Sequence, residues 1–124
     1  MIKNINANEC FKIMKVSEDS RLIDVRTHFE FKDDGYADLT SINQKVNHIT
    51  WVDKDGNINQ SFLEEIKSLN INKDTKLFFI CKSGIRSMHA GNFVFEKSIS
   101  KNIFNVEGGM SFGWKINNLP VTIK

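Results

Sequence analysis

The centre of the chain is residues 76–87, with the sequence KLFFICKSGIRS. Its first part, Lys76–Ile80, contains a continuous apolar run, which is typical of a strand covered on both faces. A short polar loop follows, and apolar residues then recur at helical spacing over residues 87–97. A buried strand, a loop and a helix in this order predict an α/β fold in which Cys81 lies at the carboxyl edge of a parallel sheet. That edge is where such folds bind ligands.

Outside this segment, strand-like and helix-like stretches alternate in the same way. The further strand-like segments are Ile2–Ile5, Leu22–Val25, Val46–Val52 and Asn102–Val106. Two further helices are expected, one capped by Asn6 or Asn8 and one within Gln60–Leu69. Residues 26–43 are polar and predict irregular structure. Since 124 residues form one core of ordinary size, we expect a single α/β domain over residues 1–124, with a mostly parallel sheet flanked by helices.

Charge and hydrophobicity exclude several classes of partner. The net charge is only +2, and no basic stripe is interleaved with aromatic residues, so nucleic acid is not an expected partner. Residues 1–20 lack the apolar core of a signal peptide, and no apolar run is long enough to cross a bilayer. We therefore expect a soluble, cytoplasmic chain without membrane contact, and we interpret its two cysteines as free thiols.

The two thiols have different surroundings. Cys10 lies on the apolar face of the first expected helix, which favours a small buried core residue. Around Cys81, loop N–H groups, the helix dipole and the side chains of Lys82 and Arg86 all favour the thiolate, which predicts a nucleophile. Gly84 gives the loop backbone freedom, and the fork of Arg86 matches oxyanions. Taken alone, the seven residues also fit a buried strand-end cysteine with solvated loop charges.

Three further segments add to the interpretation of this loop. Residues 81–87 resemble the active-site loop of the rhodanese-like sulfurtransferases. Residues 22–26 (LIDVR) followed by Glu30-Phe31, and residues 105–110 (NVEGGM) followed by Trp114 and LPV at 119–121, are similar to that family in the same order. The resemblance covers about residues 7–121. Residues 35–40 depart from the family's usual Gly-His-Ile-x-Gly-Ala, and Trp114 lies one residue further from Gly109 than expected.

The resemblance implies a rhodanese-like three-layer fold and sulfur transfer in two steps. Cys81 would attack the outer sulfur of an anionic donor such as thiosulfate, become a persulfide, and pass that sulfur to a thiol, to cyanide or to a protein acceptor. The substrate-binding residues it implies are Lys82, Ser83, Gly84, Ile85, Arg86 and Ser87. Asp24 and Arg26 are supporting residues, or else strand-end groups in an ion pair with Glu30. No metal or organic cofactor is implied.

Three other functions remain open from the sequence. Cysteine-based phosphatases and arsenate reductases use Cys-x5-Arg, but the seventh position here is Ser87, which speaks against them. A non-enzymatic interaction module and a persulfide carrier for a protein partner are the other two alternatives. His28, His48 and His89 show neither metal-ligand spacing nor a clear role as a base.

Overall fold

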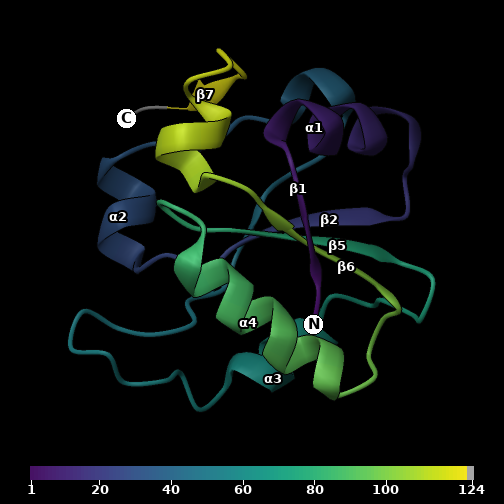
Figure 1. Cartoon of the computed structure of the whole chain (residues 1–124), viewed down its shortest axis with the longest axis vertical. Helices are drawn as coiled ribbons and strands as arrows, with labels where there is room; N and C mark the ends of the chain where they lie inside the picture. Colours follow the sequence, from purple (N-terminus) through teal and green to yellow (C-terminus); the bar gives the residue numbers. More distant parts are fainter. Residues whose placement is uncertain (123–124) are drawn as a thin grey trace.

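The structure is a computed structural model that describes residues 1–122 (Figure 1). Its main sheet has five parallel strands in the order β1-β6-β5-β2-β4. Their bounds are Lys3–Ile5 for β1, Ser20–Asp24 for β2, Asn47–His48 for β4, Lys76–Ile80 for β5 and Asn102–Val106 for β6. The apolar run of β5 therefore lies in the middle of the sheet, as the sequence predicts.

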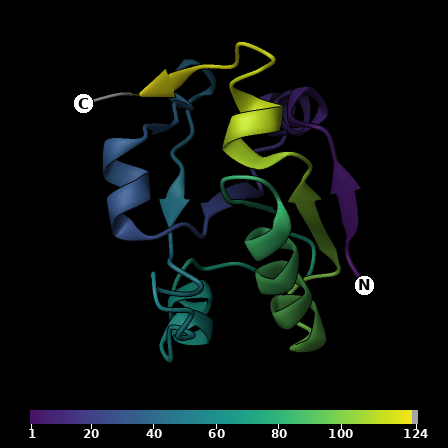
Figure 2. The same cartoon turned by 60° about the vertical axis from the view of Figure 1, so that its left-hand side comes forward.

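The two faces of the sheet are covered by different helices, which gives three layers (Figures 1 and 2). Along β5 the side chains alternate, so Leu77 and Phe79 pack on one face while Phe78 and Ile80 pack on the other. The first face is covered by α3 (Phe62–Lys67) and α4 (Ile85–Glu96), and the second by α1 (Ala7–Val16) and η2 (Gly109–Trp114). The predicted three-layer α/β fold is confirmed.

Helix α1 places the first cysteine, Cys10, in the core. Asn6 caps this helix, because its side chain accepts a hydrogen bond from the Glu9 N–H at 2.8 Å, which decides between the two predicted caps. Cys10 is fully buried against the sheet, and this burial raises the pKa of its thiol. Cys81 packs on the opposite face, so the sheet separates the two sulfurs.

Residues 26–43 are more ordered than we expected. They contain helix α2 (His28–Asp33), strand β3 (Tyr36–Ala37) and the short helix η1 (Thr40–Ile42). Helix α2 begins with a capping box, in which the side chains of Thr27 and Glu30 each accept a hydrogen bond from the other residue's backbone N–H. The strand expected over Val46–Val52 is shorter, since only β4 pairs with β2 in the sheet.

The C-terminal segment covers the end of the sheet that carries Cys81. In η2 the N–H of Lys115 bonds to the carbonyl of Met110 at 3.0 Å, a wider turn that holds one residue more than an α-helical turn. The additional residue before Trp114 falls within this wider segment, and Trp114 is fully buried. Strand β7 (Val121–Thr122) then pairs with β3 in a small antiparallel sheet. Within residues 1–122, no helix has the length and hydrophobicity that crossing a bilayer requires.

Candidate functional site

Cys81 directly follows β5 and is 1% exposed. Three groups of the loop donate toward its sulfur: the N–H of Gly84 at 3.1 Å, the N–H of Ser87 at 3.4 Å and the hydroxyl of Ser87 at 3.2 Å. Gly84 adopts the left-handed conformation (φ 104°) that turns the loop into α4, and it has no side chain to cap the helix. These donors and the N-terminus of α4 stabilise negative charge on the sulfur.

Helix η2 fixes the position of this loop from the other side. The carbonyl of Cys81 accepts a hydrogen bond from the N–H of Met110 at 2.8 Å, and that of Lys82 accepts from Ser111 at 2.9 Å. Gly109 lies against the same carbonyls, so a Cβ at this position would collide with the carbonyl oxygen of Cys81. The two predicted motifs, the loop and the Gly108-Gly109 segment, are therefore parts of one site.

A buried asparagine links the loop to the neighbouring strand. Asn105 on β6 donates to the carbonyl of Gly84 at 3.0 Å and to the side chain of Asn4 at 2.9 Å. Both amide hydrogens are thus engaged, and its oxygen accepts from the Ser87 hydroxyl at 2.5 Å. The same hydroxyl lies beside the Cys81 sulfur but carries one proton, so Asn105 and the sulfur share one donor.

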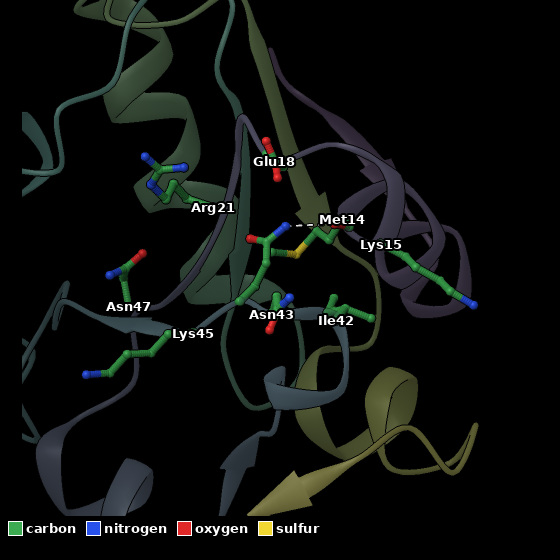
Figure 3. A pocket seen from close by; sticks show the side chains of 9 residues that line it. Met14, Lys15, Glu18, Arg21, Ile42, Asn43, Lys45 and Asn47 are labelled. Carbon is green, nitrogen blue, oxygen red and sulfur yellow. Dashed lines mark hydrogen bonds between the residues drawn. The ribbon is translucent and has the colours of Figure 1, made fainter.

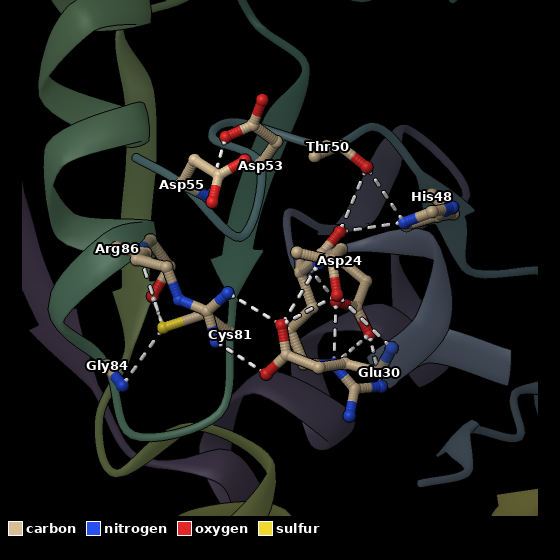
Figure 4. A network of polar contacts seen from close by, with 12 residues as sticks. Asp24, Glu30, His48, Thr50, Asp53, Asp55, Cys81, Gly84 and Arg86 are labelled. Atoms are coloured by element: carbon tan, nitrogen blue, oxygen red, sulfur yellow. Dashed lines mark hydrogen bonds and ion pairs between the residues drawn. The ribbon is translucent and has the colours of Figure 1, made fainter. Parts of the chain in front are cut away.

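Arg86 has a partner that the sequence did not predict. Its two terminal nitrogens bind the carboxylate of Glu30 at 2.7 and 2.8 Å, and both side chains are partly buried (Figure 4). Hydrogen bonds from Arg86 and then from Thr27 lower the pKa of Glu30 to about 2, against the opposing effect of burial. In return Glu30 raises the pKa of Arg86. The positive charge expected beside Cys81 is therefore compensated by a carboxylate.

The predicted supporting residues form a separate, fully buried pair. The guanidinium of Arg26 binds the carboxylate of Asp24 at 2.8–3.1 Å and also the carbonyl of Gly35 at 2.7 Å. The alternative in which these residues pair with Glu30 is wrong, because Glu30 binds Arg86. The carbonyl of Arg26 in turn accepts from the hydroxyl of Thr50 at 3.0 Å and lies 2.8 Å from Nε2 of His48.

The remaining loop residues lie at the surface of the site. Lys82, Ser83 and Ile85 are exposed, and Gly84 is partly so. Lys82 takes part in none of the ion pairs among residues 1–122. His89 is exposed on α4 and is not among the groups that bond to the sulfur. The loop thus presents a buried sulfur with polar and apolar groups around it.

The sequence names Glu30 and Asn105 only as parts of motifs and does not predict their contacts at the site. Glu30 follows Thr27 at the spacing of a capping box, a signal in the sequence that would have revealed α2. The contact of Glu30 with Arg86 spans 56 positions and has no local signal. Asn105 belongs to the NVEGGM segment, and its bond to Ser87 likewise depends on the packing of β6 beside β5.

One pocket lies away from Cys81 (Figure 3). It measures about 490 Å³, and Lys15, Arg21 and Lys45 are among its lining residues. Arg21 pairs with Leu77 near the start of β5, whereas Cys81 follows the end of that strand. A second pocket of about 310 Å³ lies beside the loop, with Ser83, Gly84 and Asn105 in its wall. Of these two pockets, the second adjoins the residues around the sulfur.

Comparisons with known proteins agree with this architecture. The profile of the Rhodanese-like domain family matches residues 8–116. The chain is 33% identical over 125 residues to Uncharacterized protein RP600 of Rickettsia prowazekii, with 97% of each chain covered. It superposes on the crystal structure of Rv0390 from M. tuberculosis with a TM-score of 0.87, 26% identity and 98% of both chains covered. It shares the fold of the polysulfide-sulfur transferase homodimer of Wolinella succinogenes, with a TM-score of 0.78 and 23% identity, over 99% of this chain and 80% of that one.

Proposed function

Because this chain belongs to the family of rhodanese-like domains, we propose that it is a sulfurtransferase that carries sulfane sulfur on Cys81 as a persulfide. The observation that carries the proposal is the position of Sγ, which lies at the start of α4 with two N–H groups and a hydroxyl directed at it. Such donors stabilise both a thiolate and the anionic sulfur of a persulfide.

The first step forms a new S–S bond on Cys81. The thiolate attacks the outer sulfur of the donor, the donor's own S–S bond breaks, and its electron pair leaves with sulfite when the donor is thiosulfate. In the second step an acceptor thiolate or cyanide attacks the terminal sulfur and releases the Cys81 thiolate. Sulfur moves without an external oxidant or reductant, and no metal or organic cofactor is needed. Loop N–H groups between Lys82 and Ser87 bind the terminal sulfur, and Arg86 contributes little to the binding of anionic donors while Glu30 holds its guanidinium.

The acceptor must come from outside the chain. Cys10 cannot take the sulfur, because it is fully buried on the opposite face of the sheet. A thiol of a protein partner is therefore as suitable as cyanide or a small thiol, and a persulfide carrier uses the same site and the same first step. The name of the Wolinella protein, a polysulfide-sulfur transferase, supports a sulfane-sulfur donor for this fold.

The phosphatase alternative has less support from the site. The seventh loop position holds Ser87, whose hydroxyl bonds to Asn105 and to the sulfur. The arginine at the sixth position binds Glu30. A phosphoryl group would therefore meet a shorter loop whose guanidinium is already engaged by a carboxylate.

The test is the intact mass of the protein after incubation with thiosulfate, with Cys81→Ser as the variant and Cys10→Ser as the matched control. We expect wild type and Cys10→Ser to gain the mass of one sulfur atom, removable by a reductant, and Cys81→Ser to gain nothing. A gain that persists in Cys81→Ser would refute Cys81 as the carrier. The absence of a gain with thiosulfate and with an alkyl persulfide would refute the proposed sulfurtransferase.

A further inference from the structure

We propose that Glu30 determines donor specificity by holding Arg86 in an ion pair, so that the site favours persulfides on uncharged scaffolds over small dianions such as thiosulfate. The inference rests on the proposed sulfur transfer and concerns which donor that reaction uses. Glu30 occupies both terminal nitrogens of Arg86 (Figure 4). These nitrogens form the fork that would otherwise bind an oxyanion end-on.

The carboxylate that occupies Arg86 is held in place independently of it. Glu30 Oε1 also accepts from the N–H of Thr27 at 3.2 Å and from its hydroxyl at 3.0 Å, so the capping box of α2 orients the carboxylate. An anionic donor must therefore compete with an ordered carboxylate that stays ionised throughout the neutral pH range. Even a donor that binds the remaining N–H groups of Arg86 meets a guanidinium whose charge is already compensated.

Charge balance around the sulfur leads to the same conclusion. Arg26 is paired with Asp24 and Arg86 with Glu30, both through bidentate contacts. Within the described part of the chain, Lys82 is then the loop cation that no ion pair engages, and it is exposed to water. A dianion therefore gains little from binding beside this loop. It loses hydration, and the one positive charge without an ion-pair partner that it meets there, on Lys82, is screened by water and salt.

Persulfides on uncharged scaffolds do not depend on that charge. Their transferred sulfur needs the donors around Sγ, which the loop supplies whether or not Arg86 is paired. When Cys81 thiolate attacks the terminal sulfur of such a donor, the scaffold leaves as its thiolate and Cys81 becomes the persulfide. The reaction balances as it does with thiosulfate, and only the leaving group differs.

The experiment measures the second-order rate constant for persulfide formation on Cys81, by quenched reaction and intact mass, with two donors. One donor is thiosulfate and the other is the persulfide of N-acetylcysteine methyl ester, which has an uncharged scaffold. Glu30→Gln removes the carboxylate charge but keeps a residue suited to a capping box. Asp33→Asn is the matched control, because it removes one charge from an exposed position on the same helix.

We expect the rate constants with thiosulfate to follow the net charge of Arg86 and Glu30 in each variant. Glu30→Gln should raise the thiosulfate rate constant about tenfold, which corresponds to about 1.4 kcal/mol, through an uncompensated Arg86. Arg86→Ala should lower it by a similar factor, since it leaves Glu30 facing the donor, and the double variant should lie between them. Rate constants with the persulfide donor should change much less, and Asp33→Asn should differ little from wild type with either donor.

Several outcomes would overturn the proposal. The proposal fails if Glu30→Gln leaves the ratio of the thiosulfate rate constant to the persulfide rate constant unchanged. It also fails if Asp33→Asn raises this ratio as much as Glu30→Gln does. It also fails if the double variant reacts with thiosulfate as fast as Glu30→Gln alone, because the gain then does not act through Arg86. Arg86→Ala keeps the test decisive if Glu30→Gln does not fold. A failure of sulfur transfer itself looks different, since Cys81 then gains no sulfur from either donor in any variant.

Discussion

The buried pair of Asp24 and Arg26 makes a strong prediction about stability. Asp24 is fully buried and Arg26 is 1% exposed, and four hydrogen bonds from the backbone N–H and guanidinium of Arg26 reach the carboxylate. Replacing Asp24 with Ala leaves the guanidinium buried with the carbonyl of Gly35 as its remaining acceptor. Removing one partner of a buried pair costs about 3–5 kcal/mol, because an uncompensated charge stays in the core.

That loss is large for a domain of this size. Total stabilities of single domains are about 5–15 kcal/mol, so Asp24→Ala should remove a major part of the free energy of unfolding. For 124 residues the entropy of unfolding is about 0.26 kcal/mol/K, which predicts a fall in Tm of about 10–20 °C. The measurements are urea unfolding and a thermal scan of both proteins under the same conditions.

A double variant separates loss of the pair from loss of a residue. Asp24→Ala/Arg26→Met replaces the charged pair with apolar groups and should recover much of the stability, because no unpaired charge remains. A loss below about 1 kcal/mol in Asp24→Ala, in the range of exposed ion pairs, would show that water compensates the guanidinium and that the assigned burial is wrong. A double variant as unstable as Asp24→Ala would assign the loss to packing instead.

Two further predictions concern Glu30 and Ser87. The lowered pKa of Glu30 means that its ion pair contributes stability above the unfolded-state value of 4.5 and loses that contribution as the pH falls toward about 2. The urea midpoint of the wild type should therefore fall more steeply between pH 5 and pH 2.5 than that of Glu30→Gln, and parallel declines would contradict the assignment. Ser87→Ala removes the hydroxyl whose single proton the sulfur and Asn105 share. It should slow persulfide formation about tenfold or more, and an unchanged rate would show that the backbone N–H groups suffice.

The sequence predicts those parts of the fold that local pattern controls. The bounds of β5 and β6 match the expected segments, because an apolar run bounded by polar residues has few ways to be buried. The glycine-containing turn that brings Cys81 to the start of α4 is local in the same way. Helix α2 also had a local signal, its capping box, and the polar composition of residues 26–43 concealed it.

The partner of each charged or polar side chain at the site depended on tertiary structure. The sequence alone determined a cysteine at the carboxyl edge of a parallel sheet, since a strand, a short loop and a helix leave it no other place. It could not determine that Arg86 binds Glu30, 56 positions away, or that Asn105 shares the Ser87 hydroxyl with the sulfur. Such contacts arise only when α2 and β6 pack beside the loop, because the ends of long polar side chains select partners by position in space.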